Sequence, residues 1–133
     1  MAEASHLLEV EDLRVEFRTE RGILKAVDGV TYTVDPGEVV AILGESGSGK
    51  TVHARAVLGI LDTPPAFVTG GSVRLEGSDL LNLPSDDMNE VRGERIAMLF
   101  QDPHAALDPV FSIGFQLTEL LRSRRGLSRR DSA

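Results

Sequence analysis

The sequence predicts an α/β fold in which a core of parallel strands and helices follows an N-terminal antiparallel β part. Two fully apolar runs, 39–43 and 96–100, are typical of strands buried on both faces of a parallel sheet. A glycine-rich loop and a helical pattern directly follow the first run. Before them, residues 7–34 alternate between apolar and polar positions and are divided by turn-forming residues. We therefore expect a mixed sheet.

The antiparallel part is expected to span residues 7–34. Residues 7–17 predict a strand at the exposed edge of a sheet, and residues 19–22 predict a turn. Two shorter strands, 23–27 and 30–34, are separated by an Asp-Gly pair that favours a hairpin turn. This part would precede the first buried strand of the core.

The loop after residue 43 matches the phosphate-binding pattern G-x-x-x-x-G-K-[ST] in full. Glycines allow successive backbone N–H groups to point into one concavity, and the helix that follows adds a partial positive charge at its N-terminus. Lys50 suits the β- and γ-phosphates, and the Thr51 hydroxyl can ligate Mg²⁺. The predicted nucleotide-binding loop consists of Gly44, Glu45, Ser46, Gly47, Ser48, Gly49, Lys50 and Thr51.

Prolines, glycines and helix-capping serines predict the boundaries of the remaining helices and strands. The helix after the loop should end near Leu61, because two prolines at 64 and 65 cannot continue it. The remaining expected elements are a strand at 72–75 after Gly70-Gly71, a short helix at 86–92 capped by Ser85, and a closing helix from 113 to about 124 capped by Ser112.

Composition excludes several classes of function. A chain of 133 residues forms at most one domain, and its net charge of −7 argues against broad nucleic-acid binding. The absence of cysteine excludes disulfides, thiolate metal sites and cysteine nucleophiles. No stretch approaches the ~18 apolar residues of a membrane span, and residues 1–6 lack the features of a secretion signal.

Two further segments resemble one family. After the second apolar run comes Phe100-Gln101-Asp102-Pro103, which resembles the Q-loop of ATP-binding subunits of ABC transporters, in the branch that imports dipeptides, oligopeptides and nickel. Residues 10–17 and 26–30 resemble the first strands of the same family. The resemblance extends from Leu7 to about Leu121 and implies a P-loop nucleotide hydrolase fold.

The resemblance implies a division of the chain. Residues 1–121 would be the N-terminal part of an ABC-type ATP-binding domain, and residues 122–133 a basic tail from a truncated helical subdomain. Within the first range, the expected parts are the antiparallel β part at 7–34, the P-loop core at 38–101, and the Q-loop with the start of the helical subdomain at 101–121.

The resemblance also implies roles for individual residues. Phe17 falls where the family places an aromatic ring that stacks on adenine, although a Phe that packs at a strand end explains it equally well. Lys50 and Gln101 would serve catalysis, and Thr51 and Gln101 would contact Mg²⁺. The implied cofactors are ATP and Mg²⁺. The implied partners are transmembrane permease subunits, a second ATP-binding subunit and, indirectly, an extracytoplasmic solute-binding protein, with no nucleic acid, at the cytoplasmic face of the membrane.

Several parts of the family's site are not found in this sequence. It contains no Leu-Ser-Gly-Gly-Gln-like signature and no apolar strand that ends in Asp-Glu. His53 and His104 do not lie where the family's switch histidine would lie, so both are expected to be ordinary packing or solvent histidines. We therefore expect these 133 residues to bind nucleotide weakly and to hydrolyse little, within a full-length ATPase that powers import.

Two alternatives remain open from the sequence: a non-catalytic nucleotide-binding fragment, or another P-loop hydrolase or kinase. The chain has no guanine-specific N/T-K-x-D motif. The apolar runs 39–43 and 96–100 are expected to present exposed surfaces that favour association between chains. The basic tail is expected to be a helix end and a solvated linker rather than a lipid or nucleic-acid site; its arginines are Arg122, Arg124, Arg125, Arg129 and Arg130.

Overall fold

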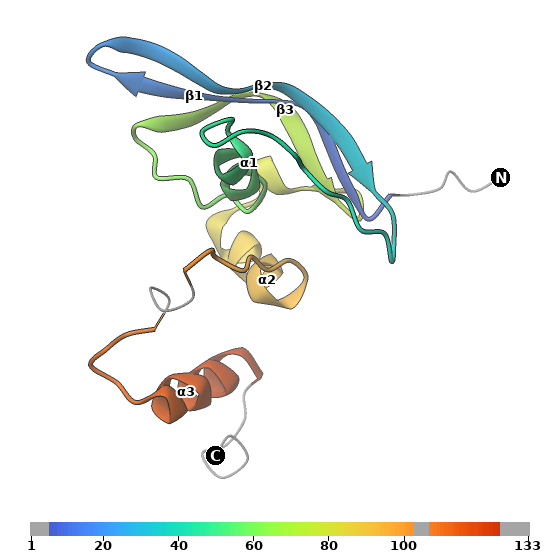
Figure 1. The fold of residues 1–133 in the computed structure, drawn as a ribbon. Helices are drawn as coiled ribbons and strands as arrows, with labels where there is room; N and C mark the ends of the chain where they lie inside the picture. Colours follow the sequence, from blue (N-terminus) through green and yellow to red (C-terminus); the bar gives the residue numbers. More distant parts are fainter. Residues whose placement is uncertain (1–5, 103–106, 126–133) are drawn as a thin grey trace, which may run out of the picture. The chain divides into compact units, whose positions relative to one another are not determined.

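The computed structural model describes residues 6–102 and 107–125 of the chain. The chain forms two compact units, Met1–Ala97 and Met98–Ala133. Within the described residues, the first unit contains a sheet with two α-helices and the second contains one α-helix (Figure 1). In this described part of the chain, every helix is too short or too polar to cross a membrane.

A four-stranded antiparallel sheet is the frame of the first unit. Strand β1 (Leu8–Thr19) pairs with β2 (Gly22–Val34) on one side and with β3 (Ala66–Leu75) on the other. The short strand β4 (Ser78–Asp79) pairs with β3, which gives the order β2-β1-β3-β4. The long β1–β2 ribbon dominates the sheet in Figure 1.

The antiparallel part differs from the sequence expectation in two ways. The prediction that β1 is an edge strand is wrong, because it has a neighbour on each side. Residues 23–34 form one strand, so the hairpin predicted at Asp28-Gly29 is also wrong. The chain reverses at the predicted turn 19–22 instead, and Gly29 is an extra residue in β2 where the register shifts, with a φ of +81°. The Asp-Gly pair therefore forms a β-bulge.

The hydrophobic core of the first unit lies against the sheet and beneath its helices. Val10, Leu13 and Val15 of β1 are at most 1% exposed, and Val73 of β3 is fully buried. Burying each such side chain stabilises the fold by about 1.5–3 kcal/mol. The same cluster includes Ala56 and Val57 from one helix and Met88 and Val91 from the next.

Helix α1 (Lys50–Val57) begins where the phosphate-loop pattern predicts and ends earlier than expected. Gly59, two residues after its last residue, has a φ of +61°, the left-handed conformation that ends many helices. The chain therefore leaves the helix before Leu61. The two prolines that were expected to stop it are not what ends it.

Helix α2 (Ser85–Glu94) and the short 3₁₀ helix η1 (Leu80–Asn82) complete the first unit. The helix predicted at 86–92 is confirmed, but Pro84 rather than Ser85 precedes its first residue, so the predicted cap is wrong. The strand predicted at 72–75 is confirmed as the end of β3, which runs through Gly70-Gly71 instead of starting after it.

Helix α3 (Ile113–Arg125) belongs to the second unit and confirms the predicted closing helix. The Ser112 hydroxyl accepts a hydrogen bond from the Phe115 backbone N–H at 3.2 Å, as a capping residue does. Near the other end, Arg122 donates to Glu119 at 2.6 Å across one turn. Arg129 and Arg130 lie outside the described residues.

The two apolar runs predicted as parallel strands are not strands in this chain. Residues 39–43 are irregular, and among residues 96–100 only Ile96 forms a bridge, to Arg92. Val39 is 94% exposed, Leu43 90% and Leu99 92%, which confirms the expected apolar exposure. A parallel strand forms only beside a neighbour that a long crossover brings to it, and within the described residues neither run has such a neighbour.

Candidate phosphate-binding site

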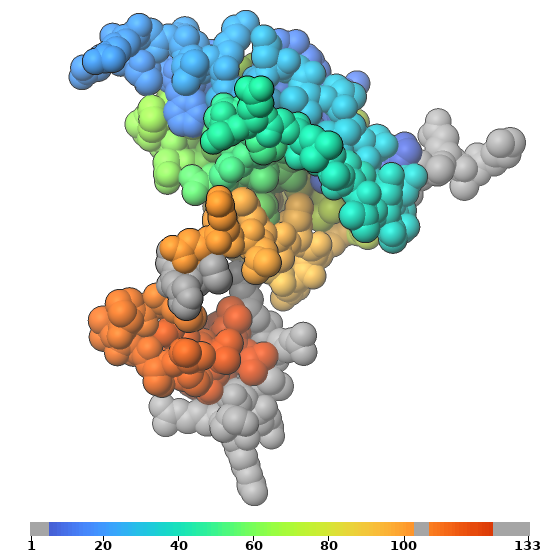
Figure 2. Space-filling view, in the orientation of Figure 1, coloured from blue at the N-terminus to red at the C-terminus, as the bar shows by residue number. Residues whose placement is uncertain are grey.

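The predicted phosphate loop lies between the exposed run 39–43 and helix α1. Figure 2 shows the segment that leads into it, coloured teal to green, at the surface of the first unit. Gly49 immediately precedes the helix with a φ of +89°. A Cβ atom at Gly49 would lie 2.2 Å from the Ala26 carbonyl oxygen of β2. Only glycine allows this turn and this close approach, so the loop is seated against the sheet.

The Lys50 ammonium points back into the loop that precedes it. Its Nζ donates to the carbonyl oxygen of Gly44 at 2.7 Å, to that of Glu45 at 2.6 Å, and to the Ser48 hydroxyl at 3.2 Å. The Ser48 N–H in turn donates to the Glu45 carbonyl at 3.2 Å. Three neutral oxygens therefore hold a positive charge at the centre of the loop. Because hydrogen bonds between ions are stronger than ion–neutral ones, a phosphate would compete well for this ammonium.

Helix α1 presents an uncompensated N-terminus to the same place. The N–H groups of a helix's first turn have no partner within the helix, and its dipole places partial positive charge there. The first turn of α1 contains no acidic residue that would neutralise this charge. The loop, the ammonium and the helix end therefore all favour an anionic ligand.

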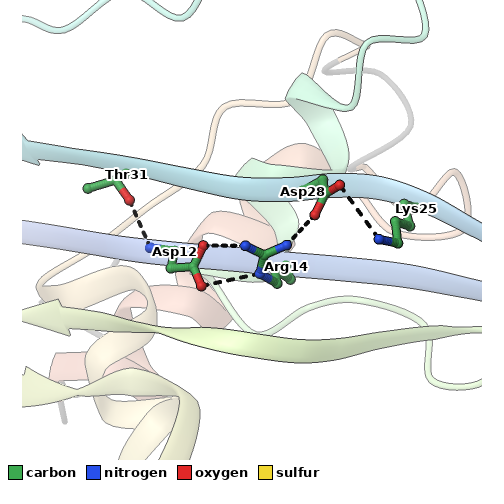
Figure 3. A network of polar contacts seen from close by, with 5 residues as sticks. All are labelled: Asp12, Arg14, Lys25, Asp28 and Thr31. Carbon is green, nitrogen blue, oxygen red and sulfur yellow. Dashed lines mark hydrogen bonds and ion pairs between the residues drawn. The ribbon is translucent and has the colours of Figure 1, made fainter.

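A cavity of about 260 Å³ adjoins Lys50 and is lined by residues of β2, the loop and α1. Asp28 is the acidic residue in this lining, and its charge is compensated. Its carboxylate forms an ion pair with Arg14 and a longer one, at 3.7 Å, with Lys25 (Figure 3). Arg14 also binds Asp12 through two nitrogens, at 2.7 and 3.2 Å, and this carboxylate raises the pKa of Arg14. Asp28 therefore does not make the cavity repel anions.

Phe17 lines a second cleft, of about 290 Å³, together with Thr51 and Arg55. Phe17 is half-buried at the end of β1, where it pairs with Leu24 and Ala66. The structure thus brings Phe17 and Thr51 to one cleft and leaves the ring partly accessible. Adenine stacking by Phe17 stays a prediction.

Gln101 belongs to the second unit, where it is exposed. Its predicted role beside the phosphates therefore stays a prediction. The same holds for Mg²⁺: the exposed Thr51 hydroxyl and an amide oxygen are hard donors that fit Mg²⁺ together with phosphate oxygens. Among the described residues, no cluster of three or more His, Cys, Asp or Glu residues could hold a metal alone.

His53 follows Lys50 by three residues and faces inward. It is 5% exposed, and in the described structure neither ring nitrogen has a hydrogen-bond partner. The Tyr32 ring packs against it with centroids 5.3 Å apart, and burial lowers the pKa of the imidazole. This confirms that it is a packing histidine. His104 lies outside the described residues.

Two features of the site were not predicted from the sequence. One is the Asp12–Arg14–Asp28 network, which crosses between strands at the Gly29 bulge. The other is Arg92 of α2, which donates to the Gly59 carbonyl just beyond α1 at 2.6 Å. Both depend on pairing between distant segments. Gly29 is a sequence signal that is consistent with a bulge, but the sequence gives no signal for the β1 residues that lie opposite it.

Comparison with known proteins places these features in a family. The family model described as "ABC transporter" matches residues 27–120. The chain is 41% identical over 129 residues to the oligopeptide transport ATP-binding protein OppD of Bacillus subtilis, covering 97% of this chain and 36% of that protein. It is 50% identical over 117 residues to OppD of Mycobacterium tuberculosis, covering 88% and 19% respectively.

A putative peptide import ATP-binding protein of Brucella abortus is 46% identical over 126 residues, with 95% of this chain and 38% of that protein covered. The chain thus spans between 19% and 38% of the length of these relatives.

Solved structures share the fold. The dimeric structure of MJ0796, a bacterial ABC transporter cassette, superposes with a TM-score of 0.79 at 22% identity, covering 94% of this chain and 52% of that one. A post-hydrolysis state of the same cassette, bound to ADP and Pi, superposes with a TM-score of 0.73 at 20% identity, covering 94% and 53%. These likenesses confirm the predicted fold class.

Proposed function

Because the chain belongs to the ABC transporter family, we propose that it forms the phosphate-binding part of an ATP-binding subunit that powers peptide import. The observation that carries this proposal is the Lys50 ammonium, held by loop oxygens at 2.6 and 2.7 Å in front of a helix N-terminus. The names of the relatives favour peptides or related solutes as the cargo of the full-length protein.

Each residue of the site has one proposed role. The N–H groups of the loop 44–49 and of the first turn of α1 bind the phosphate oxygens, and Lys50 turns from the loop carbonyls to the β- and γ-phosphates. Phe17 stacks on the adenine from the cleft it shares with Thr51. The Thr51 hydroxyl and Gln101 would hold Mg²⁺, which when bound neutralises charge on the phosphates.

We further propose that these 133 residues bind nucleotide and turn it over slowly. Phosphoryl transfer depends on positioning and on charge stabilisation around the γ-phosphate. The sequence contains neither the signature nor the Asp-Glu strand that the resemblance leads us to expect in a complete site. In the full-length protein, a second ATP-binding subunit and permease subunits at the cytoplasmic face of the membrane would complete the machinery.

The test is titration calorimetry with MgATP on this chain and on Lys50→Ala. We expect saturable binding by the parent chain and a loss of about 1.5–3 kcal/mol, or tenfold or more in Kd, in the variant, because a hydrogen bond to a charged group is removed. Arg74→Ala is the matched control, because its ion pairs with Glu9 and Glu11 are long, at 3.7 and 3.8 Å, and Arg74 contributes nothing to the loop. Equal binding by the parent and Lys50→Ala would contradict the proposal.

A further inference from the structure

The guanidinium of Arg92 binds the far end of the helix that carries the phosphate loop. Its Nε donates to the Leu58 carbonyl at 2.8 Å, and its Nη2 donates to the Gly59 carbonyl at 2.6 Å. A third bond, from Nη1 to the Asn89 side chain at 3.1 Å, fixes the guanidinium on α2. One side chain thus joins two segments that are more than thirty residues apart in sequence.

The end of α1 is shaped to receive this side chain. The N–H groups of Leu58, Gly59 and Ile60 turn back to helix carbonyls at 3.0 to 3.2 Å. The next carbonyls, those of Leu58 and Gly59, face Arg92. A Cβ atom at Gly59 would lie 2.9 Å from the Arg92 Nη2 atom, so the residue that ends the helix also admits the guanidinium.

At Arg92 the backbone leaves the helix and forms a tight turn over residues 92–96, called the 92–96 closure below. The helical conformation breaks at Arg92 and Gly93, and the Gly93 N–H donates to the Ile96 carbonyl at 2.8 Å. The N–H groups of Arg95 and Ile96 both donate to the Val91 carbonyl, at 3.0 and 3.1 Å. The first unit ends at the next residue, Ala97, and the chain then continues to Gln101.

The connection is mechanical rather than electrostatic. Eight residues make α1 about 12 Å long, which exceeds the ~8 Å over which charges act in physiological salt. The charge of Arg92 therefore adds little at the phosphate loop. Its effect is to fix the axis of the helix whose other end forms the loop.

We propose that Arg92 is a positioning residue that ties the phosphate-loop helix to the segment leading into Gln101. It acts through the Leu58 and Gly59 carbonyls on one side and through the 92–96 closure on the other. Order imposed on the loop by a bound nucleotide therefore reaches residues 93–96. This inference rests on the proposed nucleotide binding, but its first test does not need nucleotide.

The first test is amide hydrogen exchange of the nucleotide-free chain, with Arg92→Lys compared with Arg95→Lys. Both variants keep their charge. Arg95 forms an ion pair with Glu76 that lysine can also make, whereas lysine cannot reproduce the fork that binds two carbonyls. We expect Arg92→Lys to speed exchange in both α1 and residues 93–96 by about tenfold, as the loss of charged hydrogen bonds implies. Faster exchange in α2 alone would overturn the proposal.

The second test uses the unmodified chain, so it can be carried out even if Arg92→Lys does not fold. MgATP at saturating concentration is expected to slow exchange in α1 and in residues 93–96 together. Protection of α1 without residues 93–96 would overturn the proposed link and leave nucleotide binding intact. A chain that binds no MgATP in calorimetry contradicts the proposed function instead, and the nucleotide-free comparison then decides the link.

In the variant, the nucleotide result separates positioning from stability. In folded Arg92→Lys, MgATP should still slow amide exchange in α1 but no longer in residues 93–96. In Arg95→Lys, MgATP should slow exchange in both segments. The alternative is that Arg92→Lys only lowers the melting temperature, while MgATP still slows exchange in both α1 and residues 93–96 at a temperature where the variant is folded. That result would show that Arg92 only stabilises the fold and would overturn the proposal.

Discussion

Strand β1 and the run 39–43 both carry apolar side chains, but the large ones of β1 are mostly buried and those of the run are exposed. Within β1, Val10, Leu13 and Val15 are buried between two neighbouring strands and the helices. In the run, Val39 and Leu43 are about nine-tenths exposed. β1 finds β2 through a turn of a few residues, while a parallel strand requires a partner delivered by a long crossover. Apolar side chains favour burial in both segments, but within the described residues only β1 has partner strands, β2 and β3, beside which its side chains are buried.

The largest expected effect tests this contrast directly. Leu13→Ala should lower the free energy of unfolding by about 2–5 kcal/mol, because it removes a fully buried side chain and leaves a cavity. Leu43→Ala makes the same chemical change at a 90% exposed position and should change stability by less than about 0.5 kcal/mol. Urea unfolding followed by circular dichroism measures both. Equal losses would mean that residue 43 is packed in solution.

A second prediction concerns association between chains. The double variant Val39→Lys and Leu43→Lys should weaken self-association about tenfold or more, because burying one such side chain contributes about 1.5–3 kcal/mol. Sedimentation velocity over a concentration series measures the change. Thr33→Lys, at an exposed position of β2, adds a charge without removing apolar surface and should leave association nearly unchanged. A parent chain that stays monomeric throughout would contradict the prediction.

The smallest effect is a pH dependence from His53, which packs against Tyr32 between α1 and the sheet. Burial lowers its pKa in the folded chain, so the folded state resists protonation. The free energy of unfolding should therefore be unaffected by His53 above its unfolded pKa near 6.5. Below that pH it should decrease by at most about 1.4 kcal/mol per pH unit. Lys50 and Asp28 are the charged groups that line the same cavity as His53.

The measurement is urea unfolding between about pH 5.5 and 7.5, in a His6→Ala background. His6 needs removal because its hydrogen bond to Asp35 raises its pKa. It therefore contributes stability at low pH that is lost as pH rises, opposite in sign to His53. Adding His53→Leu should flatten the remaining slope, and an unchanged slope would assign the dependence to other groups.

Elements whose signals are local were predicted from the sequence. The phosphate loop, the start of α1 and the Ser112-capped helix α3 depend on residues that lie beside one another in the chain. The prediction of a hairpin turn at the Asp-Gly pair was wrong because glycine with a positive φ occurs both in hairpin turns and in β-bulges. The pairing of Asp28 with Arg14 on β1 makes it a bulge here. The contacts of Arg92 with α1 depend on tertiary packing, which no local pattern encodes.

The three oxygens around the Lys50 ammonium have one more consequence. Under the proposed function, nucleotide binding at this loop would exchange ligands rather than add one, because the incoming phosphate would replace partners that the ammonium already has. The affinity then measures only the difference between two sets of bonds. Replacing Lys50 would remove both the proposed phosphate partner and the hydrogen bonds that its ammonium donates to the Gly44 and Glu45 carbonyls and to the Ser48 hydroxyl.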